Sequence, residues 1–194
     1  MQPPPVRHTI MQGLRLLLTC ACLLAGLPAQ AQGVELATLQ TARAEGALNL
    51  EFSARVSLPK AVEDALQRGV PIYFVAEAQL LRSRWYWRDE RVARVSRSWR
   101  VAYQPLTGAW KLSLGGLNQT YHTLSEALAT ASRSAGWKLA DLAALEAGDK
   151  GYYVQFSYRL DTTQLPGPMQ FGLGSLGDKG DWAVGVSQVI KVEP

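Results

Sequence analysis

The nine residues YYVQFSYRL, 152–160, give the clearest indication of the fold. Bulky side chains at the even positions alternate with a more polar set, and this period of two is typical of a β-strand with one buried face. Buried positions are expected at Tyr152, Val154, Phe156, Tyr158 and Leu160, and outward positions at Tyr153, Gln155 and Arg159. This strand is therefore expected to form part of the core.

Two hairpins are expected before this strand. Residues 48–56 show the same alternation and should pair with residues 34–41 through a turn at Glu45-Gly46. Residues 72–87 and 92–103 are rich in strand-forming residues, and the polar segment between them predicts a second, longer hairpin. Further strands are expected at residues 110–114 and 182–192.

Apolar residues recur at helical spacing in two short segments. One is residues 61–66, with Ser57 as its expected N-cap, and the other is residues 124–131, capped by Thr123 or Ser125. About seven strands joined mostly by tight turns, with two short helices, predict an α+β fold that is mainly antiparallel β, arranged as a sheet or a sandwich.

The N-terminal segment has the pattern of a secretory signal peptide. Two arginines precede an apolar run at residues 16–27, and no acidic residue occurs before Glu35. Ala29 and Ala31 supply the small residues that signal peptidase accepts, which predicts cleavage before Gln32. The apolar run is shorter than the roughly 20 residues that span a bilayer, so an uncleaved anchor is the weaker alternative.

Cleavage would divide the chain into a signal peptide, residues 1–31, and a single globular domain, residues 32–194. Both cysteines, Cys20 and Cys22, would leave with the signal peptide, and Leu18-Thr19 fits a lipid-attachment site poorly. The remaining domain would be cysteine-free and depend on its core alone, in a compartment that permits disulfides. We therefore expect a periplasmic or secreted protein that is not transmembrane after cleavage.

Arginine and tryptophan are concentrated between residues 82 and 100. Arginine offers a fixed fork of donors and tryptophan a flat stacking face, so together they can hold phosphates, sulfates or sugar rings. The alternative is a solvated hairpin whose arginines protect an edge and whose tryptophans pack inward. The candidate binding residues are Arg82, Arg84, Arg88, Arg91, Arg97, Trp85 and Trp87.

An even-numbered turn over residues 88–91 would place Arg84 opposite Val95 and Arg82 opposite Arg97. Five of the candidate arginines would then share one face, where opposed like charges are destabilising without an anionic or acidic partner. Anionic lipid head groups, envelope glycans and an acidic protein surface are the expected partners. Nucleic acid is not expected, because an exported protein does not meet cellular DNA.

Other motifs predict no catalytic, metal or cofactor site. Residues 172–177, GLGSLG, match the dinucleotide fingerprint by letter but lack its strand and helix, so residues 171–181 are expected to form a glycine-rich loop whose role is open. His122 is the one histidine after residue 31, which leaves too few ligands for zinc. A hydrolase drawing on His122, Ser125 and a distant aspartate is an alternative without a nucleophile-elbow sequence to support it.

Several segments together resemble a known family. They are Arg159-Leu160-Asp161, the run Leu165-Pro166-Gly167-Pro168-Met169-Gln170, Trp182, and Tyr121 before Leu124-Ser125-Glu126-Ala127-Leu128. The chain is similar here to the domain of unknown function 4390 family, uncharacterised exported proteobacterial proteins, some described as proline-rich signal peptide proteins. The resemblance covers nearly all of residues 32–194. The resemblance identifies no catalytic residue. Genes of the family lie beside those of a membrane sensor kinase pair, which implies a signalling partner.

Three functions are therefore to be distinguished. The leading hypothesis is a non-enzymatic periplasmic interaction module, accessory to an envelope sensor system. The first alternative is a binder of anionic envelope ligands that uses the arginine- and tryptophan-rich hairpin. The second alternative is a hydrolase of unknown type.

Overall fold

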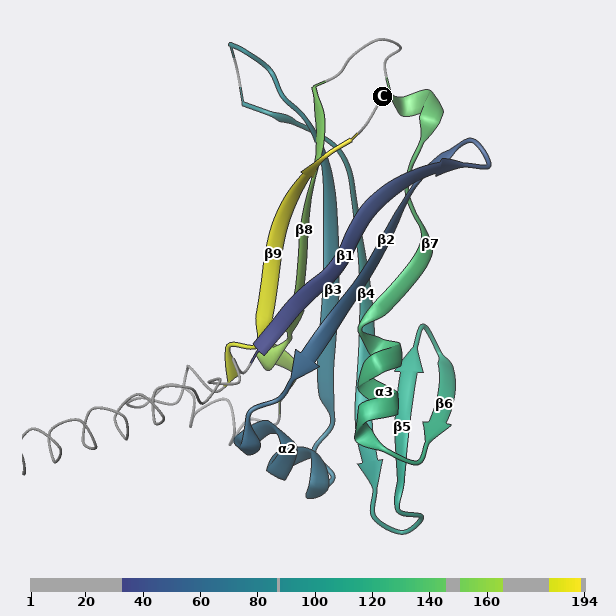
Figure 1. Ribbon diagram of the computed structural model, residues 1–194, viewed down its shortest axis with the longest axis vertical. Coiled ribbons are helices and arrows are strands. Elements are labelled where there is room, and N and C mark those ends of the chain that lie inside the picture. The colour runs from purple at the N-terminus through teal and green to yellow at the C-terminus, as the bar shows by residue number, and fades with distance from the viewer. Residues whose placement is uncertain (1–32, 87, 146–150, 166–181, 193–194) are drawn as a thin grey trace, which may run out of the picture. The chain divides into compact units, whose positions relative to one another are not determined.

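The computed structural model of the chain, shown in Figure 1, describes residues 33–86, 88–145, 151–165 and 182–192. These residues all belong to one compact unit, Gln32–Pro194. Their strands are β1 (Gly33–Ala44), β2 (Ala47–Ser57), β3 (Ile72–Arg82), β4 (Glu90–Gln104), β5 (Ala109–Leu114), β6 (Leu117–Tyr121), β7 (Arg133–Asp141), β8 (Tyr152–Leu160) and β9 (Gly185–Lys191). Their helices are α2 (Lys60–Gln67), α3 (Leu124–Ala131) and the 3-10 helices η1 (Leu142–Ala144) and η2 (Thr162–Gln164).

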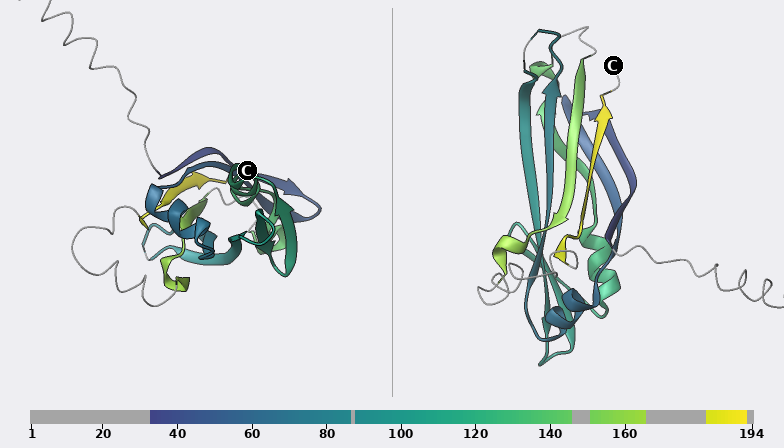
Figure 2. Two further views of the ribbon diagram at one scale, coloured as in Figure 1. Left: turned by 90° about the horizontal axis from the view of Figure 1, so that it is seen from below. Right: turned by 90° about the vertical axis from the view of Figure 1, so that its left-hand side faces the viewer.

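The strands form two antiparallel sheets, which confirms the expected α+β fold dominated by antiparallel β structure. A three-stranded sheet has the order β1-β2-β7, and a six-stranded sheet has the order β6-β5-β4-β3-β8-β9. Figure 2 shows the two sheets facing each other, with α2 and α3 at one end. Two of the strands in the described segments, β6 and β7, were not expected from the sequence.

The core lies where the inner faces of the sheets meet. In β8 every even position from Tyr152 to Leu160 is buried and Gln155 and Arg159 are exposed, as predicted, while Tyr153 is half-buried. The Phe52 ring of β2 lies 4.8 Å from the ring of Phe156 and 5.6 Å from that of Tyr158, so aromatic side chains join the two sheets. The alternation read from the sequence therefore identifies the layer that holds the fold together.

The helix α2 covers one end of the core with the apolar face that its spacing predicted, because Val62, Ala65 and Leu66 are buried. Its N-cap is Pro59, and the expected cap at Ser57 is wrong because β2 continues as far as that residue. Proline suits this boundary, since its ring fixes φ near the value that Pro59 adopts, −62°. The result is a direct passage from strand to helix.

The second helix, α3, begins with the capping box expected of a Thr-x-x-Glu sequence. Thr123 Oγ1 accepts a hydrogen bond from the Glu126 backbone N–H at 3.3 Å, and the Glu126 carboxylate accepts one from the Thr123 N–H at 3.4 Å. At the other end of α3, the buried Tyr158 hydroxyl donates to the Ala131 carbonyl oxygen at 3.2 Å. The six-stranded sheet thus holds the last turn of this helix.

The long hairpin forms between β3 and β4, but its predicted register is wrong. Arg82 lies opposite Glu90 and Leu80 opposite Ala93, and Arg97 pairs with Ala76 rather than with Arg82. The strand β3 ends at Arg82, so the connection contains residues 83–89 in place of a tight turn at 88–91. The physical reason is burial: Ile72 pairs with Val101 and Phe74 with Trp99 in the core, and Glu90 then forms ion pairs with Arg82 and Arg84 where the strands close.

Candidate functional site

The candidate site is the hairpin tip, residues 82–91, which extends β3 and β4 at one end of the molecule (Figure 1). Trp87 lies outside the described residues. Trp85 is 93% exposed and Tyr86 is 66% exposed, and their ring centroids are 4.9 Å apart in an edge-to-face arrangement. Two large aromatic side chains therefore stand in water, each gaining little burial except from the other.

Two acidic residues order the backbone of the hairpin tip. The Glu90 carboxylate lies 2.9 Å from Arg82 Nη2 and also accepts from the Arg84 guanidinium. Asp89 accepts from the Arg84 backbone N–H at 3.3 Å and from the Tyr153 hydroxyl of β8, and this last bond raises the pKa of the Tyr153 phenol. The predicted register implied that opposed arginines would lie on one face without a neutralising partner. The structure differs, because Glu90 pairs with both Arg82 and Arg84.

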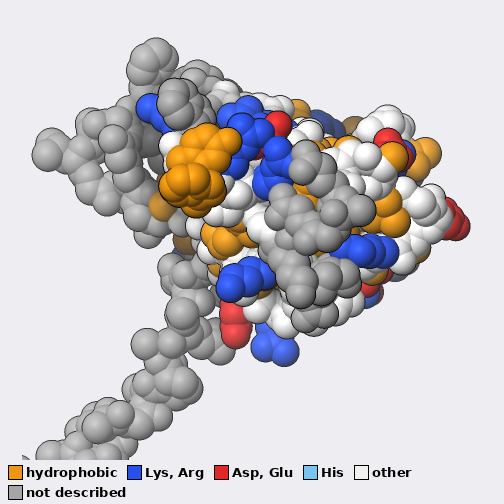
Figure 3. All heavy atoms as spheres, turned by 90° about the horizontal axis from the view of Figure 1, so that it is seen from above, with side chains coloured by type: hydrophobic (Ala, Val, Ile, Leu, Met, Phe, Trp, Pro, Cys, Tyr) orange, Lys and Arg blue, Asp and Glu red, His pale blue; other side chains and the backbone are white. Residues whose placement is uncertain are grey.

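The remaining cations of the hairpin tip are Arg88 and Arg91. Both side chains are exposed, and neither guanidinium has a hydrogen-bond or ion-pair partner within the described part of the chain. Four arginines against two acids leave the hairpin tip with a net charge of +2. Seen from above, this end of the molecule has hydrophobic side chains next to Lys and Arg side chains (Figure 3). It is an aromatic and cationic surface.

Arg97, the seventh candidate from the sequence, lies apart from the hairpin tip in the middle of β4. Its Nη1 donates to Ser134 Oγ at 2.7 Å, and its guanidinium carbon lies 5.1 Å from the centre of the Trp137 ring. Partial burial lowers the pKa of Arg97. Because Ser134 and Trp137 belong to β7, Arg97 joins the two sheets.

Sequence reasoning named Trp85 and its neighbouring arginines but missed Tyr86, which forms the other half of the aromatic pair. A strict period of two assigns Tyr86 to the face opposite Trp85. That assignment fails because both residues lie in the connection after β3, where the alternation of a strand no longer applies.

Residues 31–188 match the family described as domain of unknown function (DUF4390). The chain belongs to this family. Membership confirms the resemblance inferred from the proline-containing block and Trp182, and the match covers most of the chain. No curated protein and no solved structure gives a significant match to this DUF4390 chain. The family description names no activity.

The described residues of this DUF4390 domain contain no group of three or more His, Cys, Asp or Glu side chains that could hold a metal ion. His122 is exposed, and the Ser125 hydroxyl shares a hydrogen bond with Thr123 Oγ1 at 3.1 Å. Within the described segments, no hydrogen bond or ion pair joins His122 to an acid. The same segments include no helix long and apolar enough to cross a membrane.

Proposed function

We propose that this DUF4390 protein is an exported, non-enzymatic binding module whose hairpin tip binds the anionic head groups of a membrane surface. The observation that supports the proposal is the nearly complete exposure of Trp85 beside Tyr86, Arg88 and Arg91. Aromatic rings with a polar edge prefer the boundary between water and lipid. Arginines next to them favour a negatively charged surface.

The expected strength of this contact is modest. Removing an aromatic ring from water contributes about 2 kcal/mol, and each arginine near an anionic membrane contributes about 1 kcal/mol. Two rings and two arginines therefore sum to about 6 kcal/mol, which lies between the values for dissociation constants of about 1 mM and about 1 μM. Binding of this strength is reversible, so the hairpin tip would hold the protein at a membrane transiently and not as a permanent anchor.

A surface suits this site better than a small enclosed anion does. Glu90 already pairs with Arg82 and Arg84, and the two arginines without a partner among the described residues are both exposed, Arg88 in the connection and Arg91 at the start of β4. A protein partner, including the envelope sensor system that the resemblance implies, is the competing outcome. Binding that requires the hairpin tip but no lipid would favour such a partner.

Export rests on the N-terminal sequence. Ala29 and Ala31, which define the expected cleavage site, lie outside the described residues. The support for a location in the periplasm or outside the cell is the pattern before Gln32, in which positive charge is followed by an apolar run and small residues. In either place an anionic lipid surface is within reach of the protein.

Co-sedimentation with vesicles tests the proposal. The protein starting at Gln32 should pellet with phosphatidylcholine vesicles that contain phosphatidylglycerol, less so without it, and less at high salt, because exposed charges are screened. W85A/Y86A and R88E/R91E should each abolish pelleting. R68E, which reverses an exposed arginine at the end of α2, should leave it unchanged.

Two results would contradict membrane binding by the hairpin tip. Pelleting that is the same for R88E/R91E and the unaltered protein removes the electrostatic role of the hairpin tip. No pelleting of the unaltered protein at low salt rejects the membrane as ligand.

A further inference from the structure

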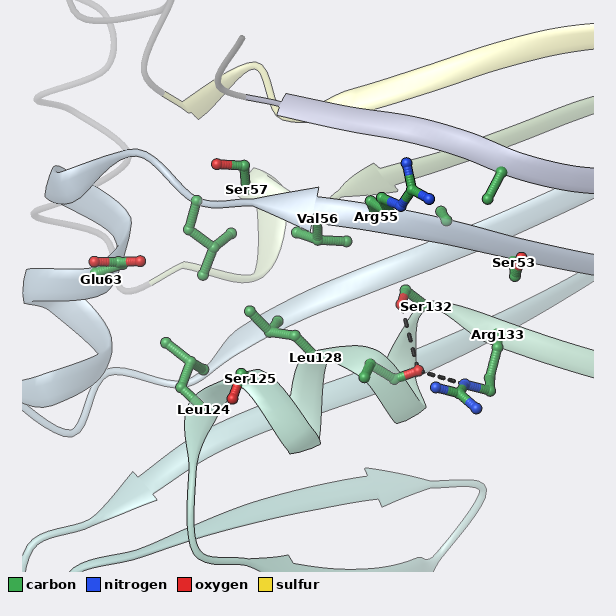
Figure 4. Close-up of a pocket in the computed structure, with 14 residues that line it drawn as sticks. Ser53, Arg55, Val56, Ser57, Glu63, Leu124, Ser125, Leu128, Ser132 and Arg133 are labelled. Atoms are coloured by element: carbon green, nitrogen blue, oxygen red, sulfur yellow. Dashed lines mark hydrogen bonds between the residues drawn. The ribbon is translucent and has the colours of Figure 1, made fainter. Parts of the chain in front are cut away.

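A groove of about 850 Å³ lies between the last residues of β2 and the helix α3 (Figure 4). Val56 of β2 and Leu128 of α3 face each other across it, and Leu124 extends this apolar floor. Arg55 on the β2 side and Arg133 on the α3 side stand at one end, and Glu63 of α2 stands at the other. The groove is thus apolar inside and oppositely charged at its two ends.

The groove exists because β7 stops pairing with β2 before β2 ends. Their last paired residues are Ser53 and Arg133, and the Ala54 N–H then donates to the Ser132 carbonyl oxygen at 2.8 Å. Beyond that bond the neighbour of β2 is a helix. A helix with its side chains is about 10 Å wide, whereas paired strands lie about 4.8 Å apart, so α3 cannot approach β2 as a strand would.

This change of neighbour leaves the backbone of Val56 open on the groove side. In an antiparallel strand the N–H and C=O of one residue point the same way, and successive residues alternate. Since the Ala54 N–H faces Ser132, the N–H and C=O of Val56 face the groove while those of Arg55 and Ser57 face β1. Within the described residues, no group across the groove bonds to Val56. An edge of this kind is a template for a further strand.

We infer that the groove binds an extended segment of another protein, which adds to β2 as a short strand in the place that β7 leaves. Residues 54–58 offer room for about four residues at 3.3 Å each. Side chains directed inward would be apolar and lie between Val56 and Leu128. Side chains directed outward would be polar and lie beside Ser53 and Ser57.

Charge selects the segment further. The Arg133 Nε donates to the Ala129 carbonyl oxygen at 2.7 Å, which fixes the guanidinium at the rim of the groove. Arg55 lies 3.9 Å from Glu35, but both side chains are about four-fifths exposed, so this pair is weak and Arg55 can turn to a ligand. The segment should therefore carry an acidic residue at the end that meets Arg55 and Arg133. Unpaired backbone donors and acceptors together favour a peptide over a lipid or a free anion.

The test uses labelled hexapeptides that alternate valine or leucine with threonine and carry aspartate at either end, with fluorescence polarisation as readout. At least one peptide should bind the protein starting at Gln32, and its copy with methylated backbone nitrogens on the pairing side should not. A129W, which fills the groove from an exposed position on α3, and R55E/R133E should weaken binding by about tenfold or more. A44W adds a tryptophan and R68E reverses a charge at exposed sites away from the groove, and both control variants should bind the peptide normally.

Direct protection of one amide completes the test. Hydrogen exchange at Val56 should slow when the peptide is bound, because its N–H then has a partner. Equal binding of the methylated peptide, or no binding of any peptide up to about 1 mM, overturns the proposal. Self-association of the protein that A129W abolishes also overturns it, since the occupant would then be a second copy of the chain. W85A/Y86A should keep peptide binding, which separates this groove from the hairpin tip.

Discussion

The substitution Tyr158→Phe isolates one buried hydroxyl that links the six-stranded sheet to α3. Tyr158 is fully buried, its ring stacks on Phe74 at 5.5 Å, and its hydroxyl donates to the Ala131 carbonyl oxygen at 3.2 Å. Phenylalanine keeps the ring contacts and removes only the donor. The Ala131 carbonyl, one of the last in α3, then loses this partner, which should cost about 1 kcal/mol of unfolding free energy near neutral pH.

The same hydroxyl predicts a pH dependence. Burial raises the pKa of the Tyr158 phenol well above its ordinary value. Below about pH 10 the phenol is neutral in both states, so the stability it provides is complete. As pH rises further, only the unfolded chain ionises, and at about pH 11 this favours unfolding by about 1.4 kcal/mol. The phenylalanine variant does not have that loss, so it should match or exceed the unaltered protein there.

Urea unfolding followed by tryptophan fluorescence, at neutral pH and near pH 11, measures this difference. Contributions from the rest of the chain are common to both proteins and cancel when the two unfolding free energies are subtracted. Tyr86→Phe, which removes an exposed hydroxyl, should leave stability at neutral pH unchanged. A difference between the Tyr158→Phe variant and the unaltered protein that is the same at both pH values would refute the reasoning, because the buried phenol would then ionise in the folded state.

Two further predictions follow from the core and from the N-terminus. Phe156→Ala should lower the unfolding free energy by about 3 to 5 kcal/mol, since Phe156 is 2% exposed and packs on Phe52, whereas Gln155→Ala on the exposed face should change it by less than about 0.5 kcal/mol. Denaturant unfolding checks both, and equal small effects would contradict the register of β8. N-terminal sequencing of exported protein should begin at Gln32, and a chain that retains residues 16–27 would reject both cleavage and the cysteine-free domain.

Of the described strands, β6 and β7 could not be predicted from the sequence, whereas the others could. The period of two in β2 and β8 locates both strands, because each residue of one parity meets the core. In β7 the pattern is broken by Gly136 and by two register shifts against β2, so no regular alternation is visible. The strand β6 is exposed along nearly all its length and offers no apolar face to detect.

The hairpin tip and the groove also differ in how far the sequence predicts them. Composition locates the segment that forms the hairpin tip, but its register follows from buried pairs such as Phe74 and Trp99 farther along the strands, which no local pattern at the tip reveals. The groove beside Val56 could not be predicted, because it depends on where β7 stops pairing with β2. Such a boundary is set by residues distant in the chain, and no local spacing encodes it.

The central position of β3 has a consequence for the order in which the protein folds. Its neighbours are β4, which follows directly, and β8, where Phe74 pairs with Leu160 near the far end of the chain. The strand β2 likewise waits for β7. Pairings this distant form slowly, because a long loop must close before they bring any gain. A chain that has been synthesised only as far as residue 150 therefore presents one bare edge of β3 to water. Until β8 arrives, that edge is a template for pairing with other chains.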